Sequence, residues 1–169
     1  MTNYKFYFFR LICLLWVVPT TVWADNKELI QNLNKIHRQA LSRFIYQTDL
    51  EHFGQIEYWA TESEVPDEGN VIGDCDDFAA LIRKLLRKQG ITSRLVYVLF
   101  LEDHKLWAHL VVEVNGWILD NRYNTVKRRD DLPYLWLSIS GYEAGSSWHA
   151  IVNRQPCVTH CGPQISASH

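Results

Sequence analysis

The stretch WAHLVVEVNGWILDNRY, from Trp107 to Tyr123, contains two runs of β-branched and aromatic residues joined by Asn115-Gly116. Asn-Gly is a preferred pair for a two-residue type I′ turn, because both central residues of that turn need positive φ angles. The stretch therefore predicts a β-hairpin in which Val114 pairs with Trp117.

The register of this hairpin predicts a pair of polar residues. Counting outward from the turn places Asp120 opposite Val111 and Arg122 opposite His109. Side chains alternate between the two faces of a strand, so His109 and Asp120 share a face as diagonal neighbours, with Cα atoms about 7–8 Å apart. We therefore expect a His109–Asp120 pair on one face of a sheet.

A cysteine begins the clearest predicted helix. GDCDDFAALIRKLL, residues 73–86, has apolar residues at helical spacing from Phe78 onward, and Gly90 follows at the position of a C-terminal cap. Cys75 continues the apolar stripe at the N-terminus. We expect this helix to pack on the sheet face that holds His109 and Asp120, with the Cys75 thiol turned toward the sheet.

The rest of the pattern predicts an α+β domain, with N-terminal helices packed on an antiparallel β-sheet. Residues 26–46 have helical spacing, whereas the polar residues 60–73 favour a loop. Strands are expected at 94–101, 107–114 and 117–123, and again in YLWLSIS and SWHAIV after Pro133.

The first residues are typical of a secretory signal peptide. Lys5 and Arg10 precede a short apolar core, LICLLWVV, and Val22-Trp23-Ala24 fits a cleavage site after Ala24. We expect a signal peptide at 1–24 and a single exported domain at 25–169, with no transmembrane segment after cleavage; an uncleaved N-terminal anchor is the alternative. The formal net charge of −2 does not favour nucleic acid as a partner.

Beyond the predicted cleavage site the chain has an odd number of cysteines, namely Cys75, Cys157 and Cys161. Cys157 and Cys161 could pair or stay reduced, and Cys75 is left as a candidate reactive thiol in either case. A nucleophilic cysteine needs a base, and the base needs an orienting acceptor. Cys75, His109 and Asp120 supply these three groups, with His149 as the second choice of base. The alternative is an inert buried cysteine, a core histidine and a turn aspartate.

The segment EYWATESE (residues 57–64) is followed in order by GDCDDFAALIRKLL, WAHLVVEV and ILDNR. Through these segments the chain resembles the bacterial transglutaminase-like cysteine proteinase family, which has a papain-like fold. The resemblance implies a periplasmic thiol protease with Cys75 as nucleophile, His109 as general base and then acid, and Asp120 orienting the imidazole. It also implies calcium held by Asp74 and Asp76. A large surface adhesin of biofilms is the implied protein substrate, and an inner-membrane receptor that sequesters the protease is the implied partner.

Several alternatives stay open. The same three residues could crosslink proteins as a transglutaminase if an amine replaced water, and the fold could serve as a non-catalytic binding module. Asp76 stands where we associate the family with Glu, and Asp74, Asp76 and Asp77 could simply cap the helix or stabilise its first turn. The tail CVTHC lacks a fourth zinc ligand and has CxxxC rather than CxxC spacing, which disfavours a zinc site and a thiol oxidoreductase.

Overall fold

The computed structural model describes residues 20–56, 58–59, 61–152 and 155–156. Its main sheet is built from β3 (Arg94–Glu102), β4 (Lys105–Val114), β5 (Trp117–Leu119), β6 (Lys127–Arg128), β7 (Leu135–Ser140), β8 (Trp148–Val152) and β9 (Gln155–Pro156). The strand order is β6-β5-β4-β3-β7-β8-β9, and every neighbouring pair is antiparallel. The antiparallel sheet expected from the sequence is confirmed.

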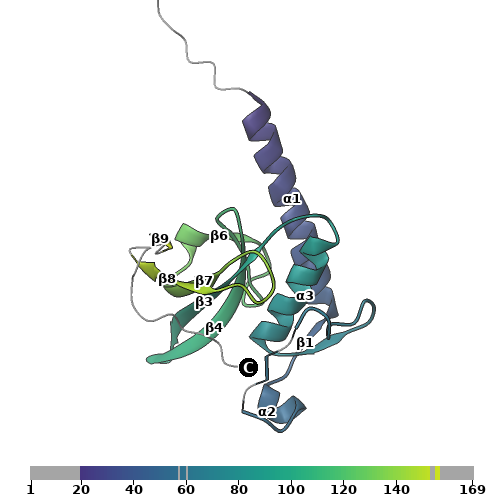
Figure 1. The fold of residues 1–169 in the computed structure, drawn as a ribbon, viewed down its shortest axis with the longest axis vertical. Helices are drawn as coiled ribbons and strands as arrows, with labels where there is room; N and C mark the ends of the chain where they lie inside the picture. The colour runs from purple at the N-terminus through teal and green to yellow at the C-terminus, as the bar shows by residue number, and fades with distance from the viewer. Residues whose placement is uncertain (1–19, 57, 60, 153–154, 157–169) are drawn as a thin grey trace, which may run out of the picture.

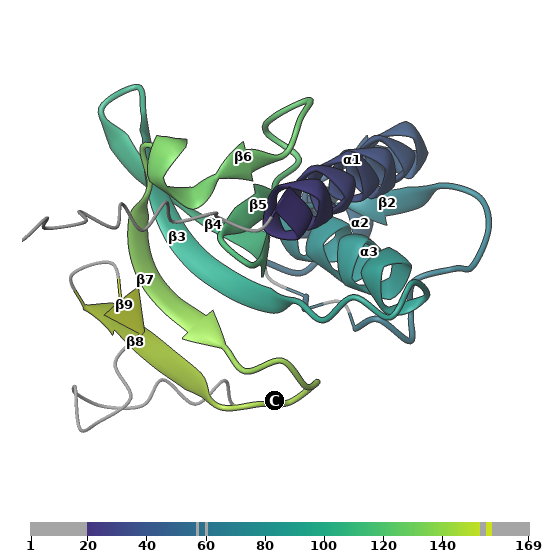
Figure 2. The ribbon, with the colours of Figure 1, turned by 90° about the horizontal axis from the view of Figure 1, so that it is seen from above.

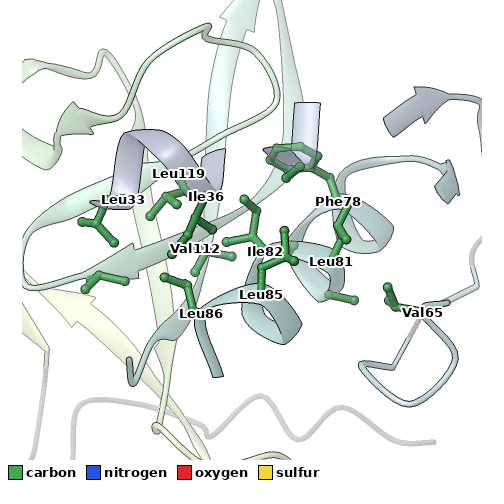
Figure 3. Packing of buried hydrophobic residues seen from close by; sticks show 14 of the residues in the cluster. Leu33, Ile36, Val65, Phe78, Leu81, Ile82, Leu85, Leu86, Val112 and Leu119 are labelled. Atoms are coloured by element: carbon green, nitrogen blue, oxygen red, sulfur yellow. The ribbon is translucent and has the colours of Figure 1, made fainter. Parts of the chain in front are cut away.

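Two helices gather on one side of this sheet (Figures 1 and 2). They are α1 (Thr20–Arg43) and α3 (Cys75–Arg87). Leu33 and Ile36 of α1 pack with Ile82 and Leu86 of α3 over Val112 of β4 (Figure 3). The expected α+β architecture is thus present, and none of the helices within the described residues is long and apolar enough to span a bilayer.

A small parallel sheet precedes α3, and the sequence did not predict it. β1 (Phe44–Tyr46) pairs with β2 (Val71–Gly73), and the short helix α2 (Asp49–His52) lies between them in the chain. The expected first helix therefore ends three residues early, and the expected loop ends in a strand. Each strand alone is too short to show a period of two, so only their pairing reveals them.

The predicted hairpin register is confirmed. Val114 pairs with Trp117, and Val112 pairs with Leu119. Asn115 and Gly116 have φ angles of 50° and 81°, as a type I′ turn requires. β5 ends at Leu119, however, whereas the sequence predicted a strand to residue 123. Asp120 ends the strand because its side chain accepts a hydrogen bond from the backbone N–H of Arg122 and its carbonyl accepts one from Tyr123.

From His109 to Val114, β4 is buried on both faces, because separate clusters cover them. On one face, Leu110, Val112 and Val114 pack with α1 and α3. On the other, Val111 packs with Ile118 and with a further set of buried side chains from β3, β7 and the segment before β7. The two clusters together fix the position of β4 and of the residues that follow its hairpin.

Candidate active site

Cys75 is the first residue of α3, and the acidic residues around it form its cap. Asp74 is the N-cap residue, and its side chain accepts a hydrogen bond from the N–H of Asp76 (3.3 Å). The carboxylate of Asp77 in turn accepts one from the N–H of Asp74 (3.0 Å), which completes a capping box. A Cβ atom at Gly73 would collide with the Asp77 carboxyl group, so the segment needs glycine there. Cys75 is half-buried at this helix N-terminus.

His109 and Asp120 lie together as the hairpin register predicted. The Nε2–H of His109 donates to Oδ1 of Asp120 over 2.8 Å, and both side chains are buried. Because Asp120 engages Nε2, Nδ1 is the ring nitrogen that remains to exchange a proton with another group. The geometry is that of a base held by an orienting carboxylate.

Tyr134 is a residue of this site that sequence reasoning missed. Its hydroxyl donates to Oδ2 of Asp120 (2.5 Å), and its ring meets the His109 ring edge-on with centroids 6.1 Å apart. Burial by itself raises the pKa of Asp120, but hydrogen bonds from His109, Tyr134 and the Arg122 N–H outweigh burial and hold the pKa below its ordinary value. Asp120 is therefore a carboxylate near neutral pH.

His37 of α1 is a second residue that sequence reasoning missed. Its Nε2–H donates to the backbone carbonyl of Asp120 over 3.0 Å. Its ring also meets Phe78, one turn into α3, edge-on at 5.9 Å. Burial lowers the pKa of His37, so the ring is neutral near pH 7. His37 thus joins the start of α3 to the end of β5, and no spacing in the sequence relates these segments.

The expectation that α3 packs on the face of His109 is wrong. α3 and Cys75 pack with Leu110, Val112 and Val114, which alternate with His109 and lie on the opposite face of β4. The alternation along β4 in fact distinguishes the two faces, because Leu106, Ala108, Leu110, Val112 and Val114 are all apolar, whereas the face of His109 also carries Lys105 and Glu113. His109 instead belongs to the face where Phe100 and Tyr134 flank its ring.

Beside His109 the edge of β4 is bordered by the segment from Asp120 to Arg122 rather than by a strand. β5 pairs with β4 only at residues 112–114, so within the described chain no strand borders β4 beside His109 on that side. The second-choice base, His149, is exposed on β8, and β3 and β7 separate that strand from β4. Cys157 and Cys161 lie outside the described residues.

The acidic residues around Cys75 form two overlapping clusters. Potential ligand atoms of Asp74, Cys75 and Asp76 lie within 4.8 Å of one another, and so do those of Asp49, Asp74 and Asp77. Asp49 is a further residue that sequence reasoning missed. It is only 2% exposed, and its Oδ2 accepts from the N–H of Tyr58, whereas its Oδ1 is buried without a hydrogen-bond partner among the described residues. A buried carboxylate oxygen without a donor is well suited to a cation.

The arrangement matches a known family and a known fold. A family model described as bacterial transglutaminase-like cysteine proteinase matches residues 13–156. The solved structure of Legionella pneumophila LapG is similar to this chain with a TM-score of 0.54 and 22% identity, over 73% of this chain and 72% of that one. An EGTA-treated structure of the same protein gives the same values. No curated protein sequence matches the chain.

Proposed function

The chain belongs to the bacterial transglutaminase-like cysteine proteinase family, and we propose that it hydrolyses a peptide bond of a protein substrate with Cys75, His109 and Asp120. The observation that carries this proposal is the buried hydrogen bond between His109 and Asp120. A histidine held in this way by a carboxylate keeps one tautomer and orientation, as a general base requires. Cys75 at the N-terminus of α3 supplies the nucleophile.

Cys75 and His109 approach from opposite faces of β4, and we place their meeting point at the edge of β4 beside His109. Nδ1 of His109 takes the thiol proton, and the thiolate attacks the carbonyl carbon of the scissile bond. The N-terminal N–H groups of α3 favour the negative charge that then develops on the carbonyl oxygen. The C–N bond breaks as His109 gives its proton to the leaving amine, and water hydrolyses the thioester to a carboxylate and the free thiol.

We propose that the acidic clusters hold calcium. The residues fit such an ion because Asp74 belongs to both clusters and because Oδ1 of Asp49 is buried without a partner among the described residues. Asp49 and Asp77 are therefore proposed as ligands in addition to the expected Asp74 and Asp76. The use of EGTA, a calcium chelator, on LapG is in keeping with this proposal. Bound calcium would offset the negative charge that these carboxylates place beside the thiol.

The cellular setting is also a proposal, and it rests on the sequence. A signal peptide at 1–24 would deliver the enzyme to the periplasm. There, the family resemblance favours a large surface adhesin as the substrate and an inner-membrane receptor as the sequestering partner. Incubation of the purified protein with the N-terminal region of a candidate adhesin, with and without a calcium chelator, tests substrate and ion together.

A thiol-alkylation experiment tests the proposed chemistry. Iodoacetamide at neutral pH should modify Cys75, as followed by mass spectrometry of its peptide, and the rate should fall in His109→Ala but not in His149→Ala. Equal rates in all three proteins would show that His109 does not activate the thiol. Addition of a primary amine then separates hydrolysis, which leaves a free carboxylate, from transamidation, which attaches the amine to the substrate.

A further inference from the structure

The apolar face of the sheet that α3 covers continues beyond the helix. Leu106 and Ala108 alternate along β4 with the covered Leu110, so all three share one face. The register pairs Leu101 with Leu106 and Leu99 with Ala108. Leu135 of β7 lies opposite Leu99 on the other side of β3. We call Leu99, Leu101, Leu106 and Leu135 the leucine face.

The leucine face lies at the Cys75 end of α3. The last residue of α3, Arg87, is followed by a short loop, residues 88–93, and then by Arg94, which pairs with Glu113 near the hairpin end of β4. The C-terminus of α3 therefore lies over this end of the sheet, and the N-terminus points toward the β3–β4 tip. Figure 1 shows the tip projecting to the left of α3, and Figure 2 shows it at the upper left, on the side of the sheet away from both helices.

The leucine face is strongly exposed and carries no charge. Leu101, Leu106 and Leu135 are 67%, 61% and 54% exposed. The charged residues of the tip, Glu102 and Lys105, belong to the opposite face, where Glu102 forms a 3.1 Å ion pair with Arg122. Leu101 and Leu106 thus lie on one face of the hairpin, and the ion pair lies on the other face, which also carries Phe100 and the half-exposed Trp107.

We propose that the leucine face is a substrate subsite that binds apolar side chains of the polypeptide on one side of the scissile bond. The proposal rests on the proposed protease function, because a polypeptide attacked by Cys75 must extend past the N-terminus of α3. The three exposed leucines offer only a few hundred Å², well below the ~800 Å² that each partner of a stable protein complex buries. A short apolar segment fits this area, whereas a second copy of the chain needs more.

A matched pair of variants tests the subsite. One double variant carries threonine at both positions (Leu101→Thr/Leu106→Thr), and the other carries valine (Leu101→Val/Leu106→Val). Threonine and valine have the same shape and both favour strands, but only threonine is polar. Each protein is given calcium and a library of amine-blocked peptides from a digested bacterial proteome, and cleavage sites are identified by mass spectrometry. For the wild type we expect Leu, Ile, Val, Met or Phe enriched at one fixed position from the cleaved bond.

For peptides with that apolar residue, kcat/KM should fall roughly tenfold in the threonine variant, mainly through KM, and stay within about threefold in the valine variant. Iodoacetamide should label Cys75 equally in all three proteins. Cleavage without an apolar preference, or a preference that survives in the threonine variant, overturns the proposed subsite and leaves the proposed protease function standing. The subsite is also overturned if the threonine substitutions only convert a dimer to a monomer in sedimentation. No cleavage by the wild type, with an unreactive Cys75, overturns both proposals.

Discussion

Tyr134 donates its hydroxyl hydrogen to Oδ2 of Asp120, the carboxylate whose other oxygen holds His109. The proposed base is therefore oriented by a carboxylate that is itself held in place by a hydroxyl fourteen residues further along the chain. Removing this hydroxyl loosens the orientation of Asp120 and raises its pKa without replacing Cys75 or His109.

We expect Tyr134→Phe to lower kcat roughly tenfold with little change in KM. The lost hydrogen bond favours the charged form of Asp120, so its pKa should rise in the variant. On the acid side of the pH profile of kcat/KM, the activity of Tyr134→Phe should therefore fall at a higher pH than that of the wild type. Tyr142→Phe, at an exposed tyrosine, is the control. An unshifted acid limb in Tyr134→Phe would contradict a positioning role.

Asp120→Asn should lower kcat by about 10³–10⁴-fold, because the amide does not stabilise the imidazolium and can hold the wrong tautomer. It should also change acid stability. The pKa of Asp120 is below its ordinary value of ~3.9, so its charge stabilises the fold above about pH 4, and this contribution disappears as pH falls through the lowered pKa. Urea unfolding between pH 2 and 7 should show the stability gap between wild type and variant narrowing below pH 4. A gap that is constant with pH would argue against the lowered pKa.

His37→Leu should reduce both stability and activity. The substitution removes one of the two donors to the buried carbonyl of Asp120, which still accepts from the N–H of Tyr123, and the lost hydrogen bond costs about 0.5–1.5 kcal/mol of unfolding free energy. The exposed His149→Leu should change stability by no more than about 0.5 kcal/mol. Denaturant unfolding measures both, and equal losses in the two variants would remove the special role of the His37 contact.

Asp49→Asn tests the calcium site through stability alone. Calcium should raise the melting temperature of the wild type, because a ligand that binds only the folded state stabilises it. The rise should largely disappear in Asp49→Asn, although Asn can still accept from the N–H of Tyr58. Glu68→Gln, at an exposed acid outside the clusters, should keep the full rise. A rise of wild-type size in Asp49→Asn would exclude Asp49 as a ligand.

The His109–Asp120 pair could be predicted because the Asn115-Gly116 turn sets the register over a few residues. The helix that begins at Cys75 was equally visible, since its caps and apolar stripe are local. The face of β4 that receives this helix was predicted wrongly although the alternation marks it, because Leu110, Val112 and Val114 are apolar, whereas His109 shares its face with Lys105 and Glu113.

The residues that sequence reasoning missed share a physical cause. His37 meets Asp120 across 83 positions of the chain, and Asp49 joins Asp74 through the pairing of two three-residue strands. Neither relation has a period or a spacing. The sequence predicts Asp77 only as a helix-capping residue, whereas the structure brings its carboxylate within 4.8 Å of those of Asp49 and Asp74.

The contact of His37 with Asp120 has a consequence for the timing of activity. The carboxylate that orients the base is secured by segments that meet only when α1, the β4–β5 hairpin and Tyr134 have all assembled. Closing the loop between His37 and Asp120 costs conformational entropy, and a partly folded chain lacks the contacts that offset this cost. A newly made chain therefore acquires its proteolytic competence together with its completed fold, and half-folded molecules are poor catalysts toward their neighbours.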